Sequence, residues 1–293
     1  MTLSHKQGDP IKPARIVVLG AGGFLGRRLL AACAAAGVEA AGLGSRDLDL
    51  TDPAAGAQLA QWLRPADVLV FLAALTPDKG RDSATLMRNL AMGRAVCEAT
   101  RSVELAQLIY ASSDAVYSFA TTLICEETPA IPTDLYGAMH RTRELMLAAE
   151  AKVPLAVLRL TAVYGADDTH NSYGPNRFAR QAFKDGRIAL FGDGEETRDH
   201  LYVGDAVDLI LKTVMRGSTG VLNLVTGKSE SFRAVADLVA EQAGKPVEIV
   251  PSARQNPATH RHFDATNLMR AFPGTRFKPL ADGLAATLGA IRG

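Results

Sequence analysis

The sequence predicts an α/β fold built on a doubly wound parallel sheet, with a smaller, discontinuous lobe formed by later parts of the chain. Short apolar runs typical of buried parallel strands alternate with helical patterns, and a glycine-rich turn follows the first run. The chain has 293 residues, of which 47% are hydrophobic and 22% charged, so it can bury a full core.

Six apolar runs are expected to form the strands of this sheet, at residues 15–20, 38–43, 68–72, 108–111, 155–160 and 221–225. Helical patterns are expected at residues 26–36, 53–62, 81–101, 136–151 and 205–215. In a sheet of this kind, ligands bind at the carboxyl ends of the strands.

The alternation is interrupted after Gly165 by a polar, turn-rich segment, residues 166–177. Beyond Gly227 we expect a helix at 232–244, a strand at 247–250 and a loop-rich tail. The predicted division is therefore a first domain at 14–164 plus 201–226, and a second lobe at 165–200 plus 227–293. The polar start of the chain, residues 1–13, is expected to be a loose tail.

Composition excludes several classes of protein. The formal net charge of +1 gives no global field that would attract nucleic acid or a membrane surface, and the longest apolar runs are too short to span a bilayer. Cys33, Cys97 and Cys125 are unclustered, which favours reduced, buried or half-buried thiols in the cytoplasm. The spacing of the histidines does not match paired metal ligands, so no metal site is expected.

The first strand leads through a glycine-rich loop into a helix. Gly20, Gly23 and Gly26 form a Gly-x-x-Gly-x-x-Gly pattern, with Phe24 and Leu25 between the last two glycines. Backbone N–H groups at the positive end of a helix suit a pyrophosphate, so the loop predicts nucleotide binding. A glycine-rich turn in another α/β protein remains the alternative.

Three later stretches extend this pattern. Residues 110–117 read YASSDAVY, residues 135–140 read LYGAMH, and residues 192–205 read GDGEETRDHLYVGD. In this order and with the glycine loop, they resemble the extended short-chain dehydrogenase/reductases, specifically the NAD-dependent epimerase/dehydratase family. The resemblance implies a Rossmann-type domain that binds NAD or NADP and a second lobe that binds a nucleotide-diphosphate sugar.

The end of the second strand bears on the choice of cofactor. An acidic residue about 20 positions after the last glycine favours NAD, whereas this chain has Gly44 followed by Ser45 and Arg46. A hydroxyl and a cation favour the 2′-phosphate of NADP, which we modestly prefer. In the alternative, Arg46 is a solvated loop charge and Asp47 acts as the acid.

The resemblance assigns further residues to the cofactor. It implies that Asp49 and Leu50 lie near the adenine, and that the cofactor passes close to the residues after the third strand. It also implies a role for an asparagine on the following helix. These last positions are Leu72, Ala73, Ala74 and Asn89.

The resemblance implies that Ser113 and Tyr136 are catalytic. The Ser hydroxyl holds the sugar oxygen and the Tyr phenol transfers a proton. The family has lysine four residues after the tyrosine, whereas this chain has His140. A histidine that titrates near 6.5 gives an altered pH profile, the reading favoured from sequence. The others are a cation supplied by Arg141 or Arg143, or a protein that binds without turnover.

The substrate side is also assigned by resemblance. Arg198 and Arg254 would bind the diphosphate, and Asn176 would face the sugar or its phosphate. Asp114 is counted with them, but Ala115 follows it where sugar dehydratases have glutamate, so dehydration is set aside.

These assignments predict an epimerase that oxidises a nucleotide-diphosphate sugar to a keto-sugar and reduces it again. An NADPH-dependent keto-sugar reductase is the first alternative, and a catalytically impaired NADP-binding regulator is the second. The resemblance further implies a homodimer formed through the helices at 81–101 and 136–151.

Overall fold

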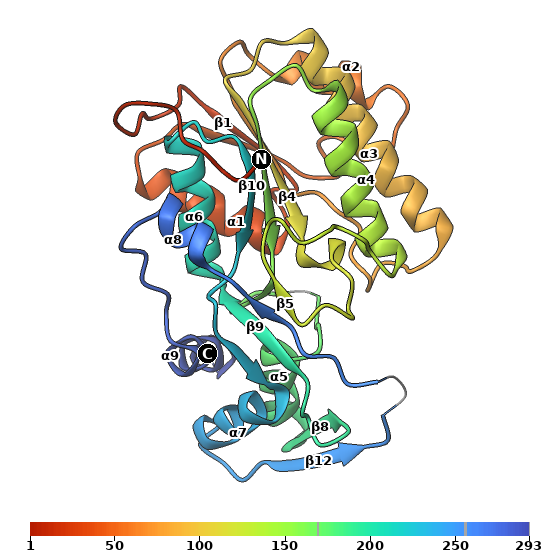
Figure 1. Cartoon of the computed structure of the whole chain (residues 1–293), viewed down its shortest axis with the longest axis vertical. Helices are drawn as coiled ribbons and strands as arrows, with labels where there is room; N and C mark the ends of the chain where they lie inside the picture. The colour runs from red at the N-terminus through yellow and green to blue at the C-terminus, as the bar shows by residue number, and fades with distance from the viewer. Residues whose placement is uncertain (169, 255–256, 293) are drawn as a thin grey trace.

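The computed structural model describes residues 1–168, 170–254 and 257–292, and it confirms the predicted α/β fold (Figure 1). Six strands form one sheet in the order β10-β6-β4-β3-β1-β2, and every neighbouring pair is parallel. All six correspond to the apolar runs predicted from sequence. Their bounds are β1 Ile16–Leu19, β2 Ala40–Leu43, β3 Val68–Phe71, β4 Gln107–Ser113, β6 Leu155–Leu160 and β10 Gly220–Leu224.

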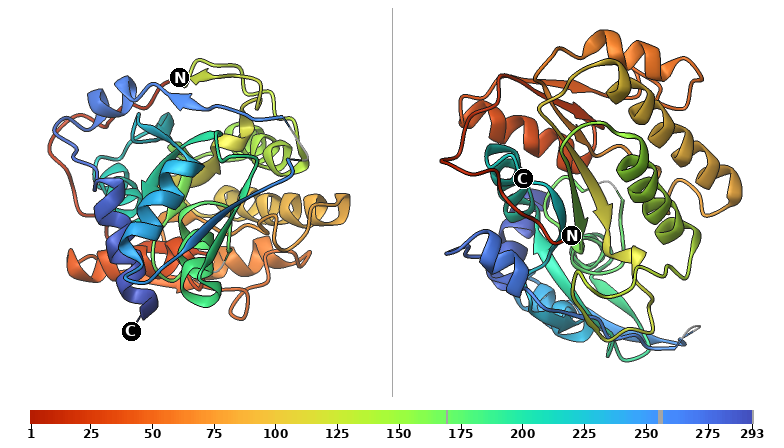
Figure 2. Two further views of the ribbon diagram at one scale, coloured as in Figure 1. Left: turned by 90° about the horizontal axis from the view of Figure 1, so that it is seen from below. Right: turned by 45° about the horizontal axis from the view of Figure 1, so that its top comes forward.

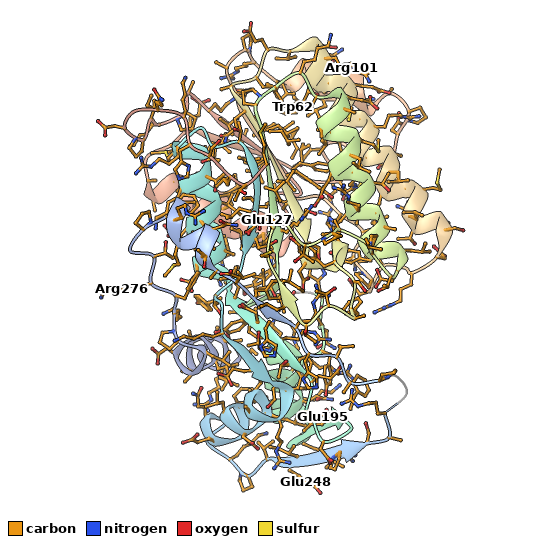
Figure 3. All side chains as sticks on the ribbon, in the orientation of Figure 1. Trp62, Arg101, Glu127, Glu195, Glu248 and Arg276 are labelled. Atoms are coloured by element: carbon orange, nitrogen blue, oxygen red, sulfur yellow. The ribbon has the colours of Figure 1, made fainter. Side chains whose placement is uncertain are left out.

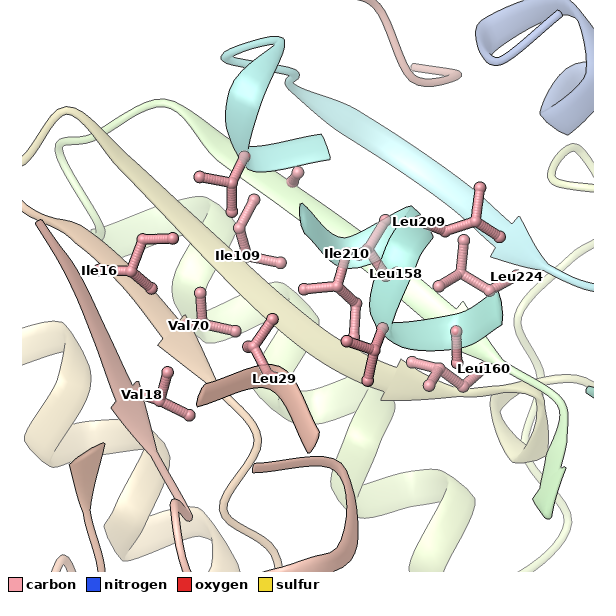
Figure 4. Packing of buried hydrophobic residues seen from close by; sticks show 14 of the residues in the cluster. Ile16, Val18, Leu29, Val70, Ile109, Leu158, Leu160, Leu209, Ile210 and Leu224 are labelled. Atoms are coloured by element: carbon pink, nitrogen blue, oxygen red, sulfur yellow. The ribbon is translucent and has the colours of Figure 1, made fainter. Parts of the chain in front are cut away.

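Helices cover both faces of this sheet. On one face lie α1 (Phe24–Ala35) and α6 (Val203–Met215); on the other lie α2 (Ala55–Trp62), α3 (Ser83–Ser102) and α4 (Leu135–Glu150) (Figure 1). Figure 4 shows Leu209 and Ile210 of α6 packed towards the aliphatic side chains of the central strands. Burial on both faces explains why the strands are continuous apolar runs.

Side-chain caps fix the start of two of these helices. The Asp82 carboxylate accepts a hydrogen bond from the Thr85 amide at α3, and the Asp134 carboxylate accepts one from the Gly137 amide at α4, at 2.7 Å. By contrast, the N-cap residue of α1 is Gly23, which offers no side-chain cap, and the first turn of α1 has no acidic residue. Its terminal amides are therefore left without a protein side chain as acceptor.

A smaller lobe lies below the sheet in Figure 1 and is seen from below in Figure 2. Helices α5 (Pro175–Asp185), α7 (Phe232–Gln242) and α9 (Leu280–Arg292) share one apolar core. Short strands accompany them in sets of two or three: β7 (Ala162–Tyr164), β9 (Thr197–Tyr202) and β11 (Ser229–Ser231), then β8 (Arg187–Phe191) and β12 (Glu248–Ser252).

The C-terminal part differs from the loop-rich tail expected from sequence. It contains α8 (Thr266–Ala271) and the 13-residue α9. Leu268 and Phe272 are buried in the cluster between the sheet and α6, so this segment packs against the larger domain. The proposed lobe boundary at 227–293 thus groups together residues that belong to two different cores.

The first residues are also not the loose tail that their polarity predicts. Thr2 and Ser4 form bridges to Val221 and Thr219, and the His5 ring bonds to the Ser218 hydroxyl and the Ala271 carbonyl. Backbone pairing with the free edge of β10 orders this segment without requiring apolar side chains.

A second short sheet joins the two parts of the molecule. Strand β5 (Leu123–Ile124), between β4 and α4, pairs in parallel with β13 (His262–Phe263), which comes from the C-terminal segment. The His262 amide donates to the Thr122 carbonyl at 2.8 Å, and the Asp264 amide donates to the Ile124 carbonyl at 2.9 Å. Within the described part of the chain, none of the helices is long and apolar enough to cross a membrane.

Candidate active site

The glycine loop is shaped by two close backbone approaches. Gly20 has φ of +87°, and a Cβ there would lie 2.9 Å from the Ala73 amide nitrogen. A Cβ on Gly26 would lie 2.3 Å from the Gly20 carbonyl oxygen, so only glycine lets α1 start this close to the loop. The uncapped amides of α1 are accessible because the glycines carry no side chains, and together they form a surface that fits a pyrophosphate.

The other predicted residues of this loop are more buried. Phe24 is 5% exposed and packs in the core beside α6, so a contact of Phe24 with a cofactor has to use its backbone amide. Leu25 is partly buried against the same cluster, and Gly23 donates its amide to the Gly20 carbonyl at 3.0 Å.

The loop after β2 presents Ser45 and Arg46 at the surface. The Asp47 carboxylate accepts a hydrogen bond from the Gly44 amide at 2.8 Å, which closes the loop on itself. Further on, the Asp49 carboxylate accepts from the Thr51 amide and hydroxyl, which lowers its pKa, while Leu50 is buried. Of the residues predicted to bind the adenosine end, Ser45, Arg46 and Asp49 are thus exposed, and Leu50 is buried.

The loop after β3 is fixed by Asn89 of α3. The Asn89 carboxamide accepts from the Leu75 amide at 2.9 Å and donates to the Leu75 carbonyl at 3.0 Å. These bonds hold the half-buried stretch that precedes Leu75 against the glycine loop. That stretch contains the predicted cofactor residues Leu72, Ala73 and Ala74.

Ser113 and Tyr136 belong to elements that touch. Ser113 ends β4, and its hydroxyl accepts a bond from the Ala115 amide at 3.1 Å, at the start of the short 3-10 helix η1 (Asp114–Val116). Tyr136 lies in the first turn of α4, where a Cβ on Gly137 would be 2.1 Å from the Ala115 carbonyl oxygen. This backbone contact brings the start of α4, with its tyrosine, to the residues that follow Ser113.

The Tyr136 phenol lies in a strongly perturbed environment. Burial raises its pKa, and the Asp114 carboxylate raises it further because a second negative charge nearby is unfavourable. The Arg143 guanidinium acts in the opposite direction and lowers the pKa of Tyr136. A hollow beside the phenol is lined by Leu75, Asn89 and Met139, among others.

His140 differs from the titrating group that the sequence favoured. It is 3% exposed, its Nδ1 lies 2.7 Å from the Tyr110 hydroxyl, and its ring meets Tyr136 edge-on at 4.7 Å between centroids. Burial, together with the nearby Arg143, lowers the pKa of His140 to about 3. His140 is therefore uncharged at neutral pH and cannot supply the positive charge of a lysine. Its Nε2 is buried with no partner in the described residues.

The predicted diphosphate ligands are held by the smaller lobe. Arg198 donates to the Thr197 and Thr259 carbonyls and to the Thr259 hydroxyl. Arg254 forms ion pairs with Glu195 at 2.9 Å and Glu196 at 3.0 Å. Figure 3 labels Glu195 in this lower lobe. A diphosphate bound by Arg254 would compete with these two carboxylates.

Asn176 does not face a substrate site as the resemblance implied. Its carboxamide oxygen accepts from the Gly165 amide at 3.1 Å, and its nitrogen donates to the Asp168 carboxylate at 2.7 Å. The side chain is 5% exposed, so it fixes the loop after β7 from within.

Arg261 is a site residue that belongs to none of the motifs found in the sequence. It is fully buried, donates to the Asp114 carbonyl at 2.8 Å and lies 3.6 Å from the Asp114 carboxylate. Burial raises the pKa of Asp114, and Arg261 opposes this. No sequence signal marks Arg261, since 147 residues separate it from Asp114.

No metal site is indicated within residues 1–168, 170–254 and 257–292, where no group of three or more His, Cys, Asp or Glu residues is placed to hold an ion. His260 and His262 flank the Thr197 hydroxyl instead, and His170 lies beside Thr76.

Comparison with known proteins places this site in a family. Residues 16–226 match the model of the NAD dependent epimerase/dehydratase family. Among solved structures, UDP-glucose 4-epimerase of Thermus thermophilus in complex with NAD is 23% identical, with a TM-score of 0.82, covering 95% of this chain and 99% of that chain.

Two further solved structures are similar over almost their whole length. UDP-N-acetylglucosamine 4-epimerase from Methanobrevibacter ruminantium M1, in complex with UDP-N-acetylmuramic acid, is 20% identical with a TM-score of 0.86, covering 96% of this chain and 99% of that chain. RMD from Pseudomonas aeruginosa, complexed with NADPH, is 25% identical with a TM-score of 0.82, covering 96% and 100%. Since the family model spans most of the sequence, this chain belongs to the NAD dependent epimerase/dehydratase family.

Proposed function

We propose that this protein is an NAD(P)-dependent epimerase that acts on a nucleotide-diphosphate sugar. The single observation that carries the proposal is the contact between Gly137 and the Ala115 carbonyl, which joins the turn after Ser113 to the turn that bears Tyr136. In a family of this chemistry, a hydroxyl and a phenol at the carboxyl end of the sheet act on one carbon of the substrate.

The chain's own residues then have defined tasks. The Ser113 hydroxyl donates a hydrogen bond to the sugar oxygen, and ionised Tyr136 takes the proton from that oxygen as the carbon is oxidised. A nicotinamide cofactor, when bound, would supply the hydride chemistry at that carbon. Tyr136 gives the proton back on reduction, so inversion requires only that the keto-sugar presents its other face.

The two lobes divide the binding work in this proposal. The loop of Gly20, Gly23 and Gly26 would hold the cofactor pyrophosphate. Arg198 and Arg254 would hold the sugar-nucleotide diphosphate, because a guanidinium offers paired donors to phosphoryl oxygens. A homodimer through α3 and α4 and a cytoplasmic location complete the proposal.

NADP is the preferred cofactor because Arg46 and Ser45 are exposed after β2, while the Asp47 carboxylate is bonded to the Gly44 amide. These features also keep a one-way NADPH-dependent keto-sugar reductase as the second candidate. The similar structure of RMD, which is complexed with NADPH, supports the choice of NADP.

The test starts with mass spectrometry of ligands released from the purified protein. A panel of UDP-, GDP- and dTDP-sugars is then incubated with each cofactor. Interconversion of sugars without net change in NADPH supports the epimerase, whereas one NADPH consumed per product supports the reductase. Cofactor binding with no turnover, unaltered by Tyr136→Phe, would point to the impaired regulator and overturn the proposal.

A further inference from the structure

Arg143 occupies the same face of α4 as Tyr136 and His140, since these residues are spaced at i, i+4 and i+7. It is fully buried. Its Nε donates to the Asn89 carbonyl at 2.8 Å, its Nη1 to the Ala73 carbonyl at 2.9 Å, and its guanidinium carbon lies 4.8 Å from the centre of the Phe71 ring.

All hydrogen-bond partners of Arg143 in the described structure are uncharged. They are backbone carbonyls and the Asn89 carboxamide oxygen, and no carboxylate lies within ion-pair distance among the described residues. A buried charge is ordinarily paired with an opposite charge, because desolvation is costly. The charge of Arg143 is therefore not cancelled locally and acts on its surroundings.

Arg141, the other candidate cation, is placed differently. Its guanidinium lies 3.0 Å from the Glu144 carboxylate, and Arg159 binds the same carboxylate at 2.7 Å and 2.9 Å. The side chain of Arg141 is 35% exposed to solvent. Its charge is thus paired with a carboxylate that it shares with Arg159, and it is screened by solvent.

We propose that Arg143 is the positioning cation of this active site, and that its buried charge stabilises the phenolate of Tyr136 in place of the lysine that the family has where this chain has His140. The inference rests on the proposed function, because a phenolate is needed only if Tyr136 exchanges a proton with the substrate. His140 then serves as a neutral hydrogen-bonding group between Tyr110 and the cofactor side.

The packing around Arg143 fits this assignment. A Cβ on Gly93 of α3 would lie 3.1 Å from the Arg143 Cγ, so a larger residue there would crowd the arginine stem. Burial raises the pKa of Tyr110, whose hydroxyl contacts His140 Nδ1, and Arg143 opposes this rise. The Tyr110 hydroxyl and His140 Nδ1 lie 2.7 Å apart and share one hydrogen bond.

Charged groups from several elements act on the Tyr136 phenol. Burial raises the pKa of Tyr136 above its ordinary value, and three carboxylates raise it further: Asp114 of η1, Asp134 at the start of α4 and Asp78 of the loop before α3. Arg143 is the cation that opposes this rise in part, and it does so from within the protein, where solvent screening is weak. Removing this charge leaves the phenol opposed by three carboxylates.

The test measures the ionisation of Tyr136 in the full chain saturated with NADP⁺, because burial and nearby carboxylates raise the pKa of the phenol in the free protein and a positive charge opposes this. Tyrosine labelled with ¹³C at Cζ is titrated by NMR, and the Tyr136 signal is identified by its loss in Tyr136→Phe. Arg143→Gln, which keeps N–H donors for Ala73 and Asn89, is expected to move the Tyr136 titration up by about one to two pH units. His140→Lys in that background is expected to reverse most of the movement. Arg141→Gln, the matched control, is expected to leave the Tyr136 titration unchanged.

Kinetics give a second readout. The acid limb of the kcat/KM profile, along which activity falls as Tyr136 is protonated, should follow the NMR titration, with Arg143→Gln at least tenfold slower at pH 7 and the double variant partly restored. If Arg143 has only a structural role, Arg143→Gln should weaken cofactor binding but leave the Tyr136 titration unchanged, and His140→Lys should not restore activity. That result would overturn the inference. If the titration moves as expected but no sugar nucleotide reacts, the proposed function fails while the role of Arg143 stands.

If Arg143→Gln does not fold, Arg143→Lys tests the same charge with a different shape. A Tyr136 titration in Arg143→Lys close to that of the wild type supports the inference. A titration raised by one to two pH units although the lysine is shown to be protonated contradicts it.

Discussion

The Gly137 backbone lies directly against the Ala115 carbonyl oxygen, where a methyl group on Gly137 would come within 2.1 Å. Gly137→Ala should therefore push α4 away from η1. We expect a loss of about 1–3 kcal/mol in the free energy of unfolding and a fall of about 100-fold in kcat, because Tyr136 would be displaced. Urea unfolding and steady-state kinetics measure the two effects.

The matched control is Gly289→Ala on the exposed side of α9, where a Cβ meets nothing within 4 Å. It should leave kcat unchanged and stabilise the protein by up to about 1 kcal/mol, because alanine favours helix more than glycine does. Full activity in Gly137→Ala would show that the contact with Ala115 does not set the position of Tyr136.

The exposed Arg46 predicts a selective effect on cofactor binding. Arg46→Ala should weaken NADP binding about tenfold, which corresponds to about 1.4 kcal/mol, and leave NAD binding unchanged. Isothermal titration calorimetry with both cofactors checks this. Asp47→Ala is the companion variant: a selective loss of NAD affinity there would assign the ribose hydroxyls to Asp47 and contradict the preference for NADP.

The buried contact between Arg261 and Asp114 predicts energetic coupling. Arg261→Met removes the donor to the Asp114 carbonyl and leaves Arg198 as the cation that acts on the Asp114 carboxylate, so we expect about 1–3 kcal/mol of destabilisation. Combining it with Asp114→Asn should cost less than the sum of the single changes, which a double-mutant cycle in urea measures. The exposed Arg270→Met serves as control, with an expected change below about 0.5 kcal/mol. If the free-energy changes of the two single variants add up to that of the double variant, the contact between Arg261 and Asp114 does not couple the two residues.

His200 predicts a pH dependence of stability. Burial among Tyr164 and Phe232 lowers its pKa to about 3, whereas the unfolded chain binds the proton near 6.5. The neutral ring therefore stabilises the fold fully above pH 6.5, and this contribution is lost as the pH falls towards 3. The wild type should lose about 2 kcal/mol of unfolding free energy between pH 8 and pH 5 through His200, and His200→Phe should remove this loss.

Urea unfolding of the wild type and of His200→Phe at these two pH values tests this. Asp199 has its pKa raised to about 6 by burial and so has the opposite sign, but it is present in both proteins and cancels in the comparison. Equal pH dependence of the two proteins would mean that His200 is protonated in the fold.

The sheet was predictable from sequence because its strands are buried on both faces and are therefore continuous apolar runs. The smaller lobe was not, since β9 reads TRDHLY and looks polar. Its Asp199 is nevertheless fully buried, because the Thr226 and Gly227 amides satisfy the carboxylate. Helix α9 was hidden by its two glycines, which lower helix propensity although Leu284 and Leu288 face the core.

The site was predictable where motifs lie close together in sequence, as at Ser113 and Tyr136. Helical spacing also brings Arg143 to the same face as Tyr136, but only the fold separates it from Arg141, because Glu144 and Arg159 meet across α4 and β6. The low pKa of His140 depends on burial, which an isolated motif does not reveal.

The parallel pairing of β5 with β13 has a mechanical consequence. One strand follows the turn that bears Ser113, and the other leads away from the segment that carries Arg254 and Arg261. Any hinge rotation of the lower lobe has to carry Leu123 and Ile124 with it or break their backbone hydrogen bonds. Opening and closing around a sugar nucleotide would therefore be transmitted, as through a tether, to the chain that leads into Tyr136.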